Sequence, residues 1–304
     1  MNSNSFSYST AHQADDESSA LYLLGFARVR STQPMRVVTD SRKVLTHLQL
    51  PESAAEYPQL LQPLGIECVQ VGSVVAWFKR IDRSEFTGDA GAANLSNLDW
   101  LTPRVLAHEA VVSQLNVCFP FYPARFGCLF SSAAKLVEFT DRHYATLQGF
   151  FQHVEGRNEW GIKFIASVDQ ATSQMADEVL QADGQTSAGV NYLRLKQLQR
   201  KLRPVALQTL EHHCGVAIAE LQAMFRFVVV RPRTSMISPD RESVISNVSL
   251  LLSEAEAQQL SEWQTAWNER SDNRLGLEAR VAGAWPAYSF CPPLSDEEPR
   301  QQVA

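Results

Sequence analysis

VISNVSLLLSEAEAQQLSEWQTAW, residues Val244 to Trp267, is a strand pattern that passes directly into a helix pattern. Its first part is rich in β-branched and aliphatic residues, which is typical of a β-strand. Ser253 and Glu256 then form an S-x-x-E capping box, the signature of a helix N-terminus. Leu260 and Trp263 follow at helical spacing, as does Trp267 itself. The stretch therefore predicts a strand followed by a helix with one apolar face.

The elements around this stretch predict an antiparallel sheet with helices on one face. In chain order they are a strand, a long helix with a break or kink at Pro204, two strands, the capped helix and a last strand. They cover residues 160–168, 187–213, 225–230, 244–252, 253–267 and 277–281. This β-α-β-β-α-β order is typical of a ferredoxin-like fold. We expect a ferredoxin-like α+β domain over residues 156–291, followed by a flexible tail over 292–304.

The first half of the chain predicts another α+β domain, over residues 20–155, after a disordered polar tail over residues 1–19. Strands are expected at 21–29 and 68–78, a long surface loop at 83–101, and helices from 102 onward and at 136–154. The first of these helices is expected to begin at Thr102-Pro103, a cap followed by proline at the first helical position. Its predicted apolar stripe consists of Leu106, Ala110, Val111, Gln114 and Leu115.

Length and composition place the chain among soluble globular proteins. It has 304 residues, enough for about two domains of about 150 residues. The net charge of −6 offers a phosphate backbone no overall attraction, so we expect no nucleic-acid partner. The polar start lacks the pattern of a secretory signal, and no window matches a membrane span, so we expect a cytoplasmic protein. The five scattered cysteines are expected to be reduced thiols.

No strong catalytic or metal-binding signature is present. His108-Glu109 lacks the second histidine of H-E-x-x-H, because position 112 is Val112. His212-His213-Cys214 places its candidate ligands on different faces of a helix, which suits a charged helix end better than a zinc site. The cations from Arg194 to Arg203 form either a solvated helix face or a grip for an acidic partner. We therefore expect no cofactor and no metal.

Two aromatic segments remain to be explained. Residues 119–130, FPFYPARFGCLF, contain prolines that limit ladder pairing and indicate an edge strand or a connector. Within them Arg125 is expected either in a structural salt bridge or as an interface anchor. Residues 283–290, GAWPAYSF, either close a core or offer a surface to a partner. Closure is the stronger expectation, with Trp285 folding back onto the helix of Trp263 and Trp267 while Tyr288 and Phe290 continue outward.

In order, several short segments resemble the gas vesicle protein F/L family, accessory proteins of gas-filled buoyancy organelles. The matching pieces are LYLLG at 21–25, HEAVV at 108–112, PARFG at 123–127, EWGIK at 159–163, YL at 192–193 and GAWPAYSF at 283–290. They span nearly the whole chain outside its tails. The chain departs from the family pattern at Ala284 and Ala287, where prolines are usual, and at Cys128, where threonine is usual. The choice between the F and L paralogues stays open.

The resemblance implies two α+β domains, the second ferredoxin-like, and a non-enzymatic role in nucleating or assembling the vesicle wall. The implied partners are the small, hydrophobic shell protein and other accessory proteins, and the implied location is the gas vesicle or the cytoplasm. We take Arg125, Phe126, Trp285, Tyr288 and Phe290 as candidate interface residues. Two rivals are a ferredoxin-like sensor of small molecules and an enzyme centred on His108-Glu109 or Cys128.

Overall fold

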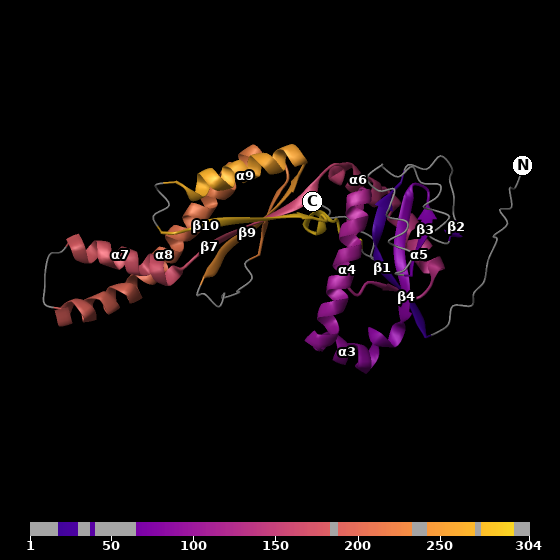
Figure 1. The fold of residues 1–304 in the computed structure, drawn as a ribbon, viewed down its shortest axis with the longest axis horizontal. Coiled ribbons are helices and arrows are strands. Elements are labelled where there is room, and N and C mark those ends of the chain that lie inside the picture. Colours follow the sequence, from indigo (N-terminus) through magenta and orange to yellow (C-terminus); the bar gives the residue numbers. More distant parts are fainter. Residues whose placement is uncertain are drawn as a thin grey trace, which may run out of the picture. The chain divides into compact units, whose positions relative to one another are not determined.

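The computed structural model describes residues 18–29, 37–39, 65–182, 188–232, 242–270 and 275–294. Two compact units divide the chain (Figure 1). The first runs to Glu155 and resumes at Cys291, and the second runs from Gly156 to Phe290. The tails predicted at 1–19 and 292–304 lie mostly outside the described residues. Within the described part of the chain, no helix is both long enough and apolar enough to cross a membrane.

The first unit is built on a sheet whose centre is β1 (Ser19–Arg28), the strand predicted at 21–29. Its other strands are β2 (Val37–Thr39), β3 (Ile66–Val71), β4 (Val74–Asp82), β5 (Phe121–Pro123) and β6 (Leu129–Phe130). The order is β2-β3-β4-β1-β5, with β6 also paired to β1. Neighbours pair antiparallel throughout. β1 is buried along almost its whole length, which explains its continuous apolar sequence.

Several predicted elements of the first unit were wrong in their boundaries. The single strand expected at 68–78 is a hairpin, in which β3 and β4 are joined by Gly72-Ser73. The single helix expected at 136–154 is two helices, α5 (Ala133–Arg142) and α6 (Tyr144–Val154), which meet at His143. The edge or connector expected at 119–130 is confirmed, because β5 ends the sheet.

The surface loop expected at 83–101 was also wrong, because this segment is largely helical. It forms the short 3-10 turn η3 (Arg83–Glu85), helix α3 (Gly88–Ser96) and the start of α4 (Leu98–Cys118). Asn97 caps α4 by accepting a hydrogen bond from the Asp99 amide at 3.0 Å, so the helix begins before Thr102-Pro103. Glycine and asparagine have low helix propensity, and tertiary packing has overridden that preference here.

A β-bulge at Leu24 decides which helix each side chain of β1 meets. The register with β4 skips Leu24, so Tyr22 and Phe26 lose the shared face that strict alternation would give them. Tyr22 contacts His108 of α4, whereas Phe26 contacts Phe139 of α5. Helices α4 and α5 therefore cover opposite faces of the sheet.

The second unit is a four-stranded antiparallel sheet packed against helices. Its elements are β7 (Asn158–Ala166), α7 (Val168–Ala182), α8 (Ala188–Met224), β8 (Val228–Arg231), β9 (Ser243–Leu252), α9 (Glu254–Asn268), β10 (Glu278–Trp285) and η4 (Tyr288–Phe290). The strand order is β10-β7-β9-β8. The predicted strands and the capped helix are present, whereas α7 was not predicted. No break occurs at Pro204, which lies inside the continuous helix α8.

The core of this unit lies between one face of the sheet and helices α8 and α9. Ile162 and Phe164 of β7 point into it, and Trp263 and Trp267 of α9 pack edge-on against Phe164. The predicted capping box at the start of α9 is confirmed by reciprocal hydrogen bonds between Ser253 and Glu256. Because side chains alternate along a strand, the neighbours of the two core residues of β7 face the other side of the sheet, away from α8 and α9.

Candidate functional site

In the first unit, Phe126 lies in a cluster of aromatic rings. Its ring centroid is 5.8 Å from those of Tyr22 and His108 and 5.7 Å from that of Phe86. Phe86 in turn contacts Trp100 of α4 at 5.3 Å. The loop that carries Phe126 is thereby fixed to β1, to α4 and to the segment before α3. Phe126 is partly exposed, so the cluster presents aromatic surface.

His108 is the buried polar centre beneath this cluster. The Ala124 carbonyl can only accept, so Nε2 of His108 carries the proton and donates to it at 3.1 Å. Nδ1 of His108 then accepts from the Tyr22 hydroxyl at 2.8 Å. Burial lowers the pKa of His108 and raises the pKa of Tyr22, so both groups are neutral. His108 therefore positions the loop after β5.

The position predicted for the apolar stripe of α4 was wrong, because the buried face of the helix includes His108. The helix buries His108, Val112, Leu115 and Cys118, whereas Leu106 of the predicted stripe is 64% exposed. Apolar residues occur on nearly all sides of α4, so periodicity could not select the face. The spacing of His108 from Val112 and Leu115, one and two turns away, was the available signal.

Arg125 is exposed beside the aromatic cluster. It is therefore not the buried guanidinium that would require a structural partner, and no ion pair among the described residues includes it. Arg125 is an exposed cation next to the half-buried ring of Phe126. The interface role of this pair stays a prediction.

In the second unit, Trp285 lies on the face of the sheet opposite helices α8 and α9. A Cβ atom on Gly161 would come within 2.8 Å of the Trp285 ring, so the indole rests directly on β7 at this glycine. The ring is 43% exposed. The expectation that Trp285 folds back onto the helix of Trp263 and Trp267 was wrong, because those rings pack on the other face, against Phe164.

The buried carboxylate of Glu159 holds the rest of this segment on the same face. Glu159 accepts hydrogen bonds from the Ser289 amide at 2.8 Å and from the Ser289 hydroxyl. Ser289 also contacts the hydroxyl of Ser249 on β9 at 3.1 Å, and Arg231 of β8 lies 3.8 Å from the carboxylate. Residues 285–290 therefore form a cover over part of the sheet, which we call the C-terminal cover. Tyr288 and Phe290 within it are half-buried.

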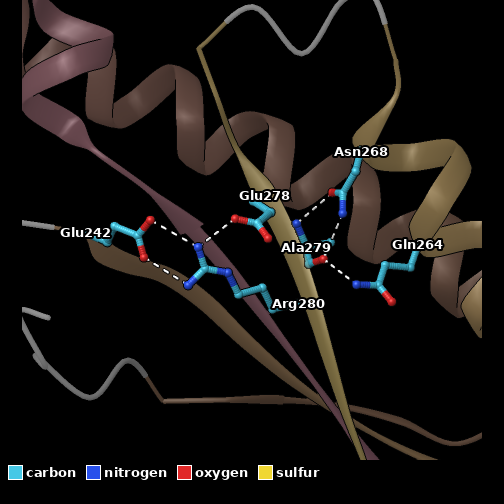
Figure 2. A network of polar contacts seen from close by, with 6 residues as sticks. All are labelled: Glu242, Gln264, Asn268, Glu278, Ala279 and Arg280. Atoms are coloured by element: carbon cyan, nitrogen blue, oxygen red, sulfur yellow. Dashed lines mark hydrogen bonds and ion pairs between the residues drawn. The ribbon is translucent and has the colours of Figure 1, made fainter. Parts of the chain in front are cut away.

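The outer edge of β10 is closed by polar contacts (Figure 2). Asn268 of α9 accepts from the Ala279 amide at 2.9 Å and donates to its carbonyl at 3.1 Å, and Gln264 donates to the same carbonyl at 2.9 Å. On the face opposite α8 and α9, Arg280 bonds Glu242 at 2.9 and 3.0 Å and Glu278 at 2.7 Å. The bond from Arg280 holds the pKa of Glu278 below its usual range. At this edge Asn268 therefore takes the place of a neighbouring strand as the hydrogen-bonding partner of β10, and Arg280 adds charge.

Neither predicted centre for enzymatic chemistry gains support from the geometry. Burial raises the pKa of the Cys128 thiol, which disfavours the thiolate that a nucleophile needs. Both ring nitrogens of His108 are engaged. Within the described ranges, no three His, Cys, Asp or Glu residues come together in a way that could hold a metal ion.

Comparisons with known proteins agree on one family. Residues 40–292 match the family model described as gas vesicle synthesis protein GvpL/GvpF. Gas vesicle protein L of Streptomyces sp. (strain CB03234) is 27% identical over 249 residues, which are 79% of this chain and 87% of that protein.

Two solved structures share the fold. The crystal structure of GvpF from Anabaena sp. PCC7120 aligns with a TM-score of 0.55 at 17% identity, covering 91% of this chain and 97% of that one. GvpF from Microcystis aeruginosa aligns with a TM-score of 0.52 at 14% identity, covering 90% and 99%. At these identities the likeness concerns the mixed α+β fold with its two antiparallel sheets.

Proposed function

The chain belongs to the GvpL/GvpF family of gas vesicle synthesis proteins, and on that premise we propose that it is a non-enzymatic assembly protein. It acts by binding the small hydrophobic shell protein and other accessory proteins, in the cytoplasm or at the gas vesicle. The shell subunit must keep one face unwettable, so free subunits aggregate before they assemble. A protein that covers that face holds subunits ready for incorporation.

The observation that carries this proposal is the C-terminal cover. It places a large, 43% exposed indole on a firm support, because the ring lies on Gly161 and the segment is held by Glu159. Residues 283–290 carry no charge, so their exposed atoms suit an apolar partner. Trp and Tyr are enriched where interfaces gain most of their binding free energy. Tyr288 and Phe290 extend the same surface.

Arg125 and Phe126 are a second proposed contact, on the first unit. The pair combines an exposed guanidinium with a ring held in place by its aromatic neighbours, so little side-chain freedom is lost when Phe126 meets a partner. The absence of an enzymatic role is supported by the neutral thiol of Cys128 and by the structural use of His108.

We also infer that the second unit is a ferredoxin-like domain with one extra helix, and that the two units are the two domains expected from the sequence. Numbered within the unit, its strands lie in the order 4-1-3-2 with all neighbours antiparallel, as the β-α-β-β-α-β pattern requires. Helices α7 and α8 together occupy the first helical position of that pattern. A small-molecule sensor built on such a domain would show ligand-dependent thermal stabilisation.

The test is capture of the shell protein by the wild type and by a Trp285→Ala, Tyr288→Ala double variant. We expect capture to fall at least about tenfold, since aromatic hot-spot residues commonly cost about 2 kcal/mol or more when truncated. The matched control is Leu106→Ala with Val117→Ala, which removes two apolar side chains of α4 that are each 64% exposed. Equal capture by a folded double variant would exclude the cover as the binding surface. Gene deletion that leaves buoyancy intact would refute the function itself.

A further inference from the structure

Among the described residues, the outer edge of β8 is an open strand edge, unlike the other edge of the same sheet. β8 ends the order β10-β7-β9-β8, and among the described residues only β9 pairs with it. Its two central side chains, Val229 and Val230, are 39% and 48% exposed. Unpaired strand edges with apolar side chains readily accept another strand, and proteins usually protect them.

The backbone groups that face this open edge can be identified from the ladder. The Leu251 amide donates to the Phe227 carbonyl at 3.2 Å, so Phe227 faces β9. In an antiparallel pair such residues alternate with residues whose amide and carbonyl point away. Val228 and Val230 therefore present their backbone N–H and C=O groups outward, whereas Val229 bonds to β9.

The opposite edge of the sheet shows what protection looks like in this fold (Figure 2). At Ala279 of β10, the amide of Asn268 supplies both the acceptor and the donor that a neighbouring strand would supply. Arg280 adds charge beside it. In the first unit, edge strand β5 contains Pro123, which has no N–H to donate. Among the described residues, no side-chain amide bonds the backbone of 228–230, and these three residues include neither proline nor charge; the charge of β8 lies at its end, in Arg231.

Charge at the ends of β8 indicates what kind of strand fits. Arg226 and Arg231 flank the valines and are both exposed. A second copy of this chain pairing antiparallel through β8 would bring four arginines to one seam, and like charges across a strand pair are destabilising. A strand that carries carboxylates near its ends and β-branched residues between them would instead complement both the charge and the apolar surface.

We propose that the β8 edge binds one extended segment of a gas vesicle partner protein, in which acidic residues flank a run of β-branched apolar residues. The segment adds a fifth strand to the sheet through the outward backbone groups of Val228 and Val230. The nature of the partner rests on the proposed function, whereas the edge itself can be tested alone.

The edge is tested by fluorescence anisotropy with a blocked heptapeptide that has threonines at its ends, glutamates at the second and sixth positions and three valines between them. Val230→Pro deletes an outward N–H without removing a bond to β9, and we expect the affinity to fall at least about tenfold. Val230→Lys places a charge at the same edge and is expected to have the same effect, should proline disturb the strand. Val216→Lys makes the same exchange at a 44% exposed valine of α8 and should leave binding unchanged.

The second part of the experiment tests whether the edge prefers an acidic peptide to a basic one. The counterpart peptide with lysines in place of glutamates should bind wild type at least about tenfold more weakly, and Arg226→Glu should narrow that difference. Amide exchange of residues 226–232 should slow when the glutamate peptide is bound. Absent binding of that peptide, or equal binding by folded Val230→Pro and Val230→Lys variants, would overturn the inference. Neither result would touch the proposed function, whose own test uses Trp285 and Tyr288.

Discussion

Residues 119–130 of the first unit and 283–290 of the second carry similar aromatic and proline residues, yet their units use them differently. The earlier segment supplies two strands, β5 and β6, that complete the sheet around β1. The later one begins as the end of β10, which runs to Trp285, and its residues 286–290 then lie over the sheet, where the Glu159 carboxylate holds Ser289. A segment inside the ladder stabilises the fold, whereas a segment laid on top can change without unfolding its support. Similar composition thus gives one structural element and one surface.

The strongest way to break this comparison is Gly25→Ala in β1. A Cβ atom there would lie 2.4 Å from the Tyr122 carbonyl oxygen and 2.4 Å from the Phe121 ring, so β5 could not stay paired. We expect a loss of about 3 kcal/mol in the unfolding free energy of the first unit, measured by urea denaturation. Gly149→Ala, in helix α6 with open space around it, should instead stabilise by up to about 1 kcal/mol. A Gly25→Ala protein of normal stability would refute the assigned role of β5.

In the second unit, Glu159→Ala removes the acceptor for the Ser289 amide and hydroxyl. We expect a cost of about 2 kcal/mol for residues 285–290, because charge-assisted hydrogen bonds are lost and a partly buried amide is left unpaired. The readout is faster amide exchange in that segment, with the first unit unchanged. Glu278→Ala is the control, since that half-exposed glutamate contacts Arg280 and lies outside the cover. Unchanged exchange at 285–290 would show that the cover is held by something else.

A smaller effect is expected in the pH dependence of stability, which His108 should give to the first unit. Burial lowers the pKa of His108 in the folded first unit, so the unfolded chain takes up a proton first as the pH falls below about 6.5. The stabilising contribution of neutral His108 is complete above that pH and is lost progressively until the folded pKa is reached. Urea midpoints at pH 7.5 and 5 should show this loss. His108→Gln should reduce the slope, and His153→Gln, at an exposed histidine, should not. Equal slopes in both variants would contradict the assignment.

The smallest effect on stability is expected from Gly161→Ala, which alters the contact of the Trp285 ring with β7 and leaves both units folded. The added methyl meets the Trp285 side chain rather than the backbone, so the ring moves and the strands do not. Stability should change by no more than about 0.5 kcal/mol. Acrylamide should quench tryptophan fluorescence more strongly, because the indole is lifted from β7. Identical quenching in the wild type and the variant would argue against the contact between the Trp285 ring and Gly161.

Local signals in the sequence predicted the elements that depend on neighbouring residues. The strand pattern of β1 and the capping box before α9 were both confirmed, because each is set within a few residues. Helix α3 was missed, since Gly88 to Ser96 contains weak helix formers that only packing makes helical. The face of α4 was misjudged because the helix is apolar nearly all round.

The candidate site was harder to predict, since its contacts join distant residues. Glu159 and Ser289 are 130 positions apart, and Tyr22 and His108 are 86 apart. Nothing in one sequence pairs them. The sequence did single out both aromatic segments, and the interface roles of their residues stay predictions.

The chain leaves the first unit after Glu155 and returns to it at Cys291, where Tyr122 bonds the Pro292 carbonyl at 2.8 Å. Glu159 near the start of β7 is paired with Trp285 at the end of β10, so the second unit begins and ends side by side. The second unit is therefore an insertion within the sequence of the first unit. Proteolysis at one of the two connections between the units would leave them joined through the other connection. A short linker between residues 155 and 291 would give a chain that contains the first unit alone.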